Sequence, residues 1–363
     1  MLLAFYLLTL FLLLSCGSGQ LQAEKLAVES KNTFLDSLVK IGHGFYEIFG
    51  IFGNAFGDAL GLTAVKSGDK RSKVGEHFEK IKKGLGDTKE KLNELSNKIS
   101  EAKNANSSTI EAVKSAINTA NDVFEQLITA LTKLADTVKD DNSIGHNDNN
   151  AAAAAEKAGV EAIIAGVRDI IGAADKSGVK INAGDAGGEV TAAANTDAPA
   201  VLGGHNNAAA GAGAGDKLAV EVVKADPWAM LDKIKNATAT ATATATDPVT
   251  LAQSNNNETG ALAAANANAN NYGAKTNADL VAAVALKAMT KDGKFRADNA
   301  DDGAIKAASV TAVNKVLGIL DFIIRKTVES NLNKIREAVK GMQYFETTTE
   351  STEATTTQSA VTK

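Results

Sequence analysis

Residues 74–100 read VGEHFEKIKKGLGDTKEKLNELSNKIS, and the spacing of their apolar side chains decides the fold. Along this stretch, apolar or partly apolar residues recur alternately four and three positions apart. They are Val74, Phe78, Ile81, Leu85, Thr88, Leu92, Leu95 and Ile99. This alternation is a heptad pattern, which indicates a helix that packs against another helix through knobs-into-holes contacts.

The same pattern resumes after a polar break at residues 104–107. It contains Ile110, Val113, Ile117, Ala120, Phe124, Leu127, Leu131, Leu134 and Val138. Because the break is short, we expect the two helices to form an antiparallel hairpin with arms roughly 40 Å long, at about 1.5 Å per residue. Ser108 and Glu111 have the spacing of a capping box, so we expect this pair to begin the second helix.

Apolar periodicity predicts further helices beyond the hairpin. They span residues 151–172, about 216–236, 276–293 and about 304–341. The Asp226-Pro227 dipeptide should restart the second of these, because Asp caps a helix and Pro suits its first turn. Thr276 and Asp279 resemble a capping box for the third helix, which we expect to end with Gly293 as its C-cap.

The composition favours an all-α protein, an elongated helical bundle rather than a broad globular core. Aromatic residues make up 5% of the chain and Pro occurs three times, whereas Ala is abundant. We expect one body over residues 24–343 and a disordered tail at residues 344–363. Near its start, Gly53, Gly57 and Gly61 form a row of small residues. Such a row allows close helix packing, so we expect paired N- and C-terminal helices.

Several segments have a composition typical of loops. Residues 173–215 are mostly Ala, Gly, Asn and Asp, residues 237–246 are five Ala-Thr dipeptides, and residues 254–273 are rich in Asn and Ala. Such segments bury too little apolar surface to offset the entropy of ordering them, so we expect distal surface loops. We therefore predict a loop-rich, variable region at residues 140–275, where substitutions have little effect on stability.

Two polar features beside the hairpin have simple interpretations. The basic stretch KSGDKRSK, residues 66–73, is most simply a solvated turn. His77 lies next to the heptad seam and is most simply a helix-surface residue.

The N-terminus carries the features of a lipoprotein signal. Leu2 to Leu14 is almost wholly apolar, but this run is shorter than the roughly 17–25 residues that cross a bilayer as a helix. It fits the apolar region of a signal peptide at residues 1–15. Leu13, Leu14 and Ser15 precede Cys16 as in a bacterial lipobox, in which the cysteine thiolate accepts a diacylglyceryl group.

Cys16 is the single cysteine, so the chain forms no intramolecular disulfide. We expect it to be the lipidated N-terminus of the mature protein, followed by a tether at residues 16–23. The alternative is an incidental cysteine in an ordinary signal peptide. No later run of comparable apolarity suggests a second membrane segment.

Catalytic, metal-binding and nucleic-acid-binding functions find little support. The formal net charge is −5 and the isoelectric point about 5.6, which disfavours binding to nucleic acid. The four histidines are scattered, and the acidic turns at residues 140–142 and 298–302 lack the spacing of an EF-hand. Neither a P-loop nor a nucleophile elbow occurs. We therefore expect no enzyme activity, no cofactor and no metal site.

Three motifs together resemble a known family. They are IGHGFYEIFGIFGNAFGDALG at residues 41–61, ALKAMTKDGKF at residues 285–295 and AVNKVLGILDFIIRKTVESNLNKIREA at residues 312–338. With the lipobox cysteine, they are similar to the variable large proteins, surface lipoproteins of relapsing-fever Borrelia related to the Lyme-disease variable surface lipoprotein.

The resemblance implies a lipid-anchored antigen on the cell outer membrane, which varies to evade host antibody. It also implies an elongated helical body with its terminal helices near the membrane and variable loops far from it. Residues 285–295 look like the constant segment of that family which antibodies recognise. The alternative is an adhesin that binds a host protein, and a homo-oligomer is possible in either case.

Overall fold

The computed structural model describes residues 2–57, 64–238, 256–265 and 272–345. Side chains are described from residue 22 onward within these ranges, except at residues 23 and 54–57. The described residues form nine α-helices and two short 3-10 helices, and isolated β-bridges pair residues in the segments that connect them. The predicted all-α fold is therefore confirmed.

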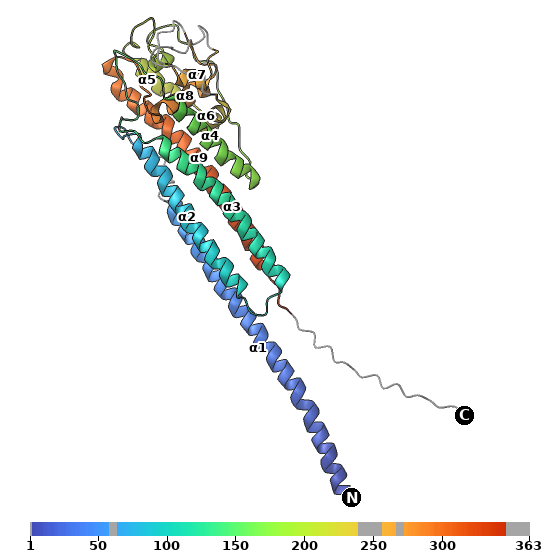
Figure 1. The fold of residues 1–363 in the computed structure, drawn as a ribbon. Coiled ribbons are helices and arrows are strands. Elements are labelled where there is room, and N and C mark those ends of the chain that lie inside the picture. The colour runs from blue at the N-terminus through green and yellow to red at the C-terminus, as the bar shows by residue number, and fades with distance from the viewer. Residues whose placement is uncertain (1, 58–63, 239–255, 266–271, 346–363) are drawn as a thin grey trace, which may run out of the picture.

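Four long helices lie lengthwise and form what we call the shaft (Figure 1). They are α1 (Leu2–Gly57), α2 (Ser72–Ser100), α3 (Ser107–Thr137) and α9 (Asp302–Lys340). Helices α2 and α3 pack against each other as the predicted antiparallel hairpin, while α1 covers α2 and α9 covers α3. Helix α1 continues through residues 16–23, the predicted tether.

The heptad pattern correctly identified the seam of the hairpin. All eight residues predicted in α2 are buried. In the second arm, Ile110 is half-buried and the other eight predicted residues are buried. The predicted capping box is wrong, because the helix begins two residues earlier: Asn106 is the N-cap, and its side-chain oxygen accepts a hydrogen bond from the Ser108 amide at 2.9 Å.

The end of α9 is fastened to the turn between α2 and α3. The Asn106 amide donates to the Gln343 carbonyl at 2.8 Å, and the Phe345 amide donates to the Asn104 carbonyl at 2.8 Å. The ring of Tyr344 also lies 5.8 Å from that of Phe34 on α1, centroid to centroid. The N-terminal end of α1 and the C-terminal end of α9 therefore lie at the same end of the shaft (Figure 1).

Close packing of α1 on α9 through the glycine row is not observed. Helix α1 turns the apolar residues Phe45, Ile48 and Phe52 inward and packs mainly on α2, with only slight contact to α9. Gly53 is exposed, and a Cβ added to it would meet no atom within 4 Å. Gly61 lies outside the described residues, and of Gly57 only the helical backbone is described. The larger apolar residues, rather than the glycines, determine which face is buried.

The remaining elements form a head at the other end of the shaft (Figure 1). They are α4 (Lys157–Lys176), η1 (Ala198–Leu202), α5 (Ala214–Lys224), α6 (Pro227–Asn236), α7 (Thr259–Ala263), α8 (Asn277–Met289) and η2 (Asn299–Asp301). Helices α5, α6, α7 and α9 all contact α8. Every residue of α8 is buried, so this helix is the core of the head.

Some predicted boundaries in the head are confirmed and others are wrong. Asp226 caps α6 by accepting from the Trp228 amide at 2.8 Å, and Thr276 caps α8 by accepting from the Asp279 amide at 3.1 Å. Helix α8 ends at Met289, so Gly293 is not its C-cap. Helix α4 begins at Lys157 rather than at residue 151, because the preceding residues pair with residue 294 as an extended segment.

The predicted surface loops are in part buried, which corrects the prediction that residues 140–275 carry little packing. Residues 198–205 are all buried, and residues 259–263 form the buried helix α7. Tyr272 is fully buried and donates to the Gly204 carbonyl at 3.0 Å. Small side chains allow these segments to pack closely around α8. Most of the Ala-Thr repeat, and the tail after residue 345, lie outside the described residues.

One stretch of the described chain, residues 299–340, is long and apolar enough to cross a bilayer by length and composition. It consists of η2 and α9. However, 61% of its most apolar window is buried inside the protein. Because α3, α5 and α8 cover it, α9 has the surroundings of a core helix.

Candidate functional site

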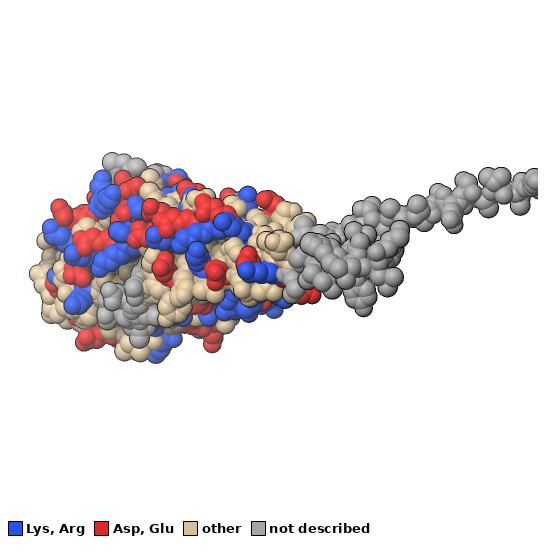
Figure 2. Space-filling view, turned by 90° about the horizontal axis from the view of Figure 1, so that it is seen from below, with Lys and Arg blue, Asp and Glu red and all other residues tan. Residues whose placement is uncertain are grey.

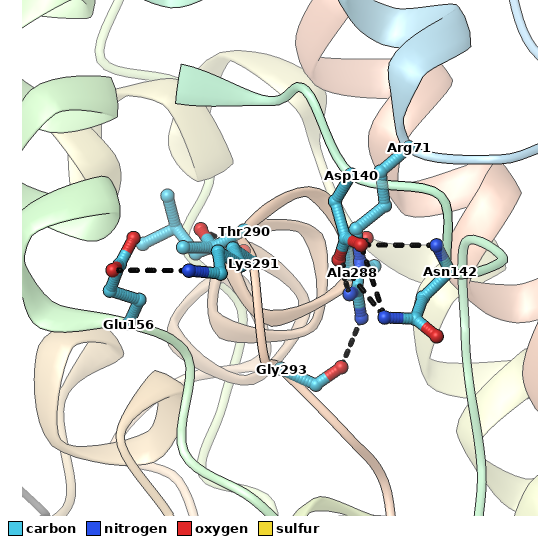
Figure 3. Close-up of polar contacts among 9 residues, drawn as sticks. Arg71, Asp140, Asn142, Glu156, Ala288, Thr290, Lys291 and Gly293 are labelled. Carbon is cyan, nitrogen blue, oxygen red and sulfur yellow. Dashed lines mark hydrogen bonds and ion pairs between the residues drawn. The ribbon is translucent and has the colours of Figure 1, made fainter. Parts of the chain in front are cut away.

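Arg71 lies in the predicted solvated turn, yet it is fully buried, so that prediction is wrong for this residue. Its Nε donates to the carbonyl oxygen of Ala288 at 2.9 Å, at the end of α8. The two terminal nitrogens donate to the Asp140 carboxylate and to the Gly293 carbonyl. Figure 3 shows this arrangement, which we call the Arg71 clamp. A cation here also satisfies the carbonyl end of a helix.

Asp140 completes the clamp from the segment after α3. Its Oδ1 accepts hydrogen bonds from the backbone amide and the side-chain amide of Asn142, both at 3.1 Å. Burial acts to raise the pKa of Asp140, but these bonds and the Arg71 guanidinium outweigh burial and hold the pKa below its usual value. The carboxylate is therefore charged at neutral pH. The clamp joins the start of α2 to the segment after α3 and to the end of α8, 69 and 217 positions away in the sequence.

The turn after α8 makes a close backbone contact. The Thr290 hydroxyl donates to the Leu286 carbonyl at 2.7 Å, and Asp292 adopts a left-handed conformation with φ of 65°. Gly293 then passes so near the helix that an added Cβ would lie 2.0 Å from the Lys287 carbonyl oxygen. Only glycine fits this position without a backbone shift.

Residues 146–156 hold the other edge of this turn. The Phe295 amide donates to the His146 carbonyl at 2.9 Å, and the Lys294 amide donates to the Ala153 carbonyl at 3.0 Å. The Glu156 amide donates to the Lys291 carbonyl at 2.9 Å, and their side chains form an ion pair at 3.9 Å (Figure 3). The motif at residues 285–295 is thus fixed by backbone bonds on both sides.

Lys287 lies inside the head without any exposure. Its Nζ donates to the Ala265 carbonyl and lies 6.0 Å from the centroid of the Phe295 ring. Burial, together with the nearby positive charge of Arg71, lowers the pKa of Lys287 to about 7. Within residues 285–295 only Lys291 and Asp292 are exposed. The motif is therefore an internal support rather than a binding surface.

A second buried polar pair joins the shaft helices α2 and α9. His77 is 8% exposed, and its Nε2 lies 3.0 Å from both carboxylate oxygens of Asp321, which is 4% exposed. Burial raises the pKa of Asp321, and the hydrogen bond from His77 partly offsets that rise. The prediction of a surface histidine is therefore wrong, because α9 covers this face of α2.

The exposed part of the head includes residues 182–189, which lie between α4 and η1 in the sequence. Seven of these eight residues are exposed, and Ala186 is half-buried. Their backbone is nonetheless fixed to α8: the Asn277 amide donates to the Gly188 carbonyl at 2.8 Å, and the Ala278 amide donates to the Ala186 carbonyl at 2.9 Å. The side chains of this loop are therefore presented to solvent on a fixed backbone.

Charges on the surface are mixed rather than concentrated. On the face shown in Figure 2, acidic and basic side chains lie next to one another. Many form short pairs along one helix, such as Lys83 with Asp87 at 2.6 Å and Lys91 with Glu94 at 2.7 Å. Among the residues that the structure describes, no group of three or more His, Cys, Asp or Glu residues is placed to hold a metal ion.

The predicted lipobox lies within the first half of α1. Leu13, Leu14, Ser15 and Cys16 belong to the helix, but their side chains are outside the described part of the structure. The lipobox and the Arg71 clamp are at opposite ends of α1, so the structure does not bring them together (Figure 1).

Known proteins resemble this chain over nearly its full length. The model of the family described as Borrelia lipoprotein matches residues 45–339. Variable large protein 14 of Borrelia hermsii is 64% identical over 351 residues, covering 96% of each chain. Variable large protein 10 of the same organism is also 64% identical, covering 96% of this chain and 94% of the relative.

A solved structure is similar as well. The Lyme disease variable surface antigen VlsE of Borrelia burgdorferi superposes with a TM-score of 0.66 at 26% sequence identity. The match covers 85% of this chain and 99% of VlsE.

Proposed function

The chain belongs to the Borrelia lipoprotein family, and we propose from this that a lipid on Cys16 holds it on the cell outer membrane with its head outward. It is a variable surface antigen that takes part in antigenic variation. The relatives named above are surface antigens, and we propose that the chain itself has no enzymatic activity. Its partners in this proposal are membrane lipid and host antibody.

The sequence before Cys16 supports the anchor. An apolar run ends in Leu-Leu-Ser-Cys, and several acyl chains at about 0.8 kcal/mol per buried methylene would make attachment effectively permanent. Labelling of cells with palmitate tests the site. The wild-type chain and the control Ser15→Ala, which keeps a small residue before the cysteine, should be labelled, and Cys16→Ala should not. Equal labelling of Cys16→Ala and wild type would contradict the proposal.

Within the head, some segments are buried and others are exposed, and this difference supports our proposal about where antibodies bind. Residues 285–290 are at most 2% exposed where they are apolar, whereas residues 182–189 face solvent. We propose that antibodies against intact cells bind the exposed parts of residues 140–275. Substitutions there change the surface that antibody meets, while the buried segment preserves the fold.

Flow cytometry with two purified antibody sets tests this arrangement. Antibodies against residues 182–189 should stain intact cells, and antibodies against residues 285–295 should bind only the denatured protein. Immunoblots of denatured protein control for the quality of both sets. Strong staining of intact cells by the second set alone would overturn the proposal.

A further inference from the structure

Helix α1 carries two apolar faces, of which the bundle covers one. The covered face holds Phe34, Ile41, Phe45, Ile48 and Phe52, all buried. The other face holds Val28, Leu35, Val39 and Tyr46, which are 58%, 49%, 59% and 81% exposed. A helix at the surface of a soluble protein normally has one apolar stripe, with polar residues opposite. The second stripe of α1 therefore lacks a partner within the described chain.

The exposed residues lie on one line along the helix. Successive members are seven, four and seven residues apart, which places them within about 40° of one another at about 100° per residue. Gly42 and Gly53 lie on the same face, and a Cβ added to either would meet no atom within 4 Å. No described atom covers this face at the two glycines, and the glycines carry no side chain, so another helix could approach the backbone of α1 closely there.

This spacing fits the seam of a two-stranded coiled coil. Val28 and Leu35 fall at d positions, and Asn32, Val39 and Tyr46 fall at a positions. A β-branched residue at a with Leu at d favours two strands, and a single Asn at a fixes the register and the number of strands. Asn32 is exposed on the free face, where it could pair with the Asn32 of a second copy.

Charges beside the stripe favour the same partner in a parallel arrangement. Lys31 is at a g position and Asp36 at the following e position, and both are exposed. On one helix they point about 140° apart, but in a parallel pair a g residue faces the e residue five positions further along the other helix. Lys31 of each copy would therefore meet Asp36 of the other. Glu24 of one copy would face Glu29 of the other in the same way, and the repulsion between these like charges disfavours extension of the pairing toward residue 24.

We propose that α1 pairs with α1 of a second copy of this chain, as a parallel coiled coil over residues 28–46. The two-fold axis runs along the exposed stripe, so that one patch contacts itself. Both N-termini then point the same way, as attachment to one membrane requires. The pairing does not depend on antibody recognition, and it stands whether or not Cys16 carries lipid.

Cysteine cross-linking of the full chain on intact cells tests the interface. Leu35→Cys places a thiol in the seam, and Lys40→Cys, at an exposed position off the stripe, is the matched control. The wild-type chain, with Cys16 as its single cysteine, is the blank. After mild oxidation, Leu35→Cys should run at twice the monomer mass on a non-reducing gel, and Lys40→Cys should not. Equal yields from both variants, or no dimer from Leu35→Cys, would overturn the proposal.

A charge exchange then distinguishes a second copy from any other occupant of this face. In the Leu35→Cys background, Lys31→Glu alone or Asp36→Lys alone should lower the dimer yield by about two- to five-fold, since each change makes two symmetric pairs repulsive. The double variant should restore the yield. A host protein on this face would give no such rescue, so failure of the double variant to recover would refute the parallel self-pairing.

Discussion

Residues 182–189 and residues 285–295 both belong to the head, but they support it in different ways. The first loop is fixed through its backbone, by bonds from the Asn277 and Ala278 amides, while its side chains face water. The second segment is fixed through side chains as well, because α8 is wholly buried. A surface antigen can therefore change side chains where backbone bonds hold the loop, and must keep them where the core contacts them.

Removal of the Arg71 clamp should have the largest effect of the changes considered. Arg71→Ala would leave the partly buried Asp140 carboxylate and two carbonyls without their partner, so we expect a loss of about 3–5 kcal/mol in the free energy of unfolding. Urea denaturation measures it. The neighbour Lys70, whose side chain is 58% exposed, is the control, and Lys70→Ala should cost less than about 0.5 kcal/mol. Similar losses in the two variants would show that the clamp is dispensable.

Gly293→Ala should be the next most damaging change. Its Cβ would lie 2.0 Å from the Lys287 carbonyl oxygen, and the forced backbone shift should cost about 1–3 kcal/mol. Gly172 in α4 is the matched control, because a Cβ there meets no atom within 4 Å. Gly172→Ala should instead stabilise the protein by about 0.5–1 kcal/mol. Thermal melts that rank the two substitutions in the opposite order would contradict this account of the turn.

Gly184→Ala tests whether exposure alone makes a loop tolerant. Gly184 is exposed, but its φ is +69° and an added Cβ would lie 2.4 Å from the Ala229 amide nitrogen. We expect a loss of about 1–2 kcal/mol in chemical denaturation, because only glycine adopts this backbone region without strain. A neutral result would mean that the loop backbone moves freely, and the comparison above would then rest on exposure alone.

Ala183→Ser, at the neighbouring position, should have the smallest effect. Ala183 is exposed, so the free energy of unfolding should change by less than about 0.5 kcal/mol. Binding of antibodies raised against residues 182–189 should nevertheless fall, as titration on intact cells would measure. A stability loss as large as that of Gly184→Ala would show that the side chains of this loop carry packing after all.

The elements that the sequence predicted well are those with a local repeat. The heptads of α2 and α3 place one apolar side chain per turn on a single face, so periodicity alone located both arms and their buried seam. The caps at Asp226 and Thr276 were equally local, since each acts on residues two or three positions away.

The candidate site was not predictable because its contacts are long-range. Arg71 donates a hydrogen bond to Ala288, which lies 217 positions away in the sequence. Nothing in the sequence around Arg71 distinguishes it from the exposed lysines beside it. His77 is hidden by Asp321, 244 positions away. Helix α8 is buried on all sides, so its sequence has no polar face that would indicate which side meets solvent. The Ala-rich segments around it lack the large apolar side chains by which a core is usually recognised.

The fastening of α9 to the α2–α3 turn has a practical consequence for anyone who labels this protein. The Phe345 amide binds the Asn104 carbonyl, so the described chain ends beside that turn, at the end of the shaft opposite the head. A fluorescent reporter fused directly after Phe345 would start at that end. A dye at position 183 would lie in the head, so energy transfer between the two labels would measure the distance from the head to the opposite end of the shaft.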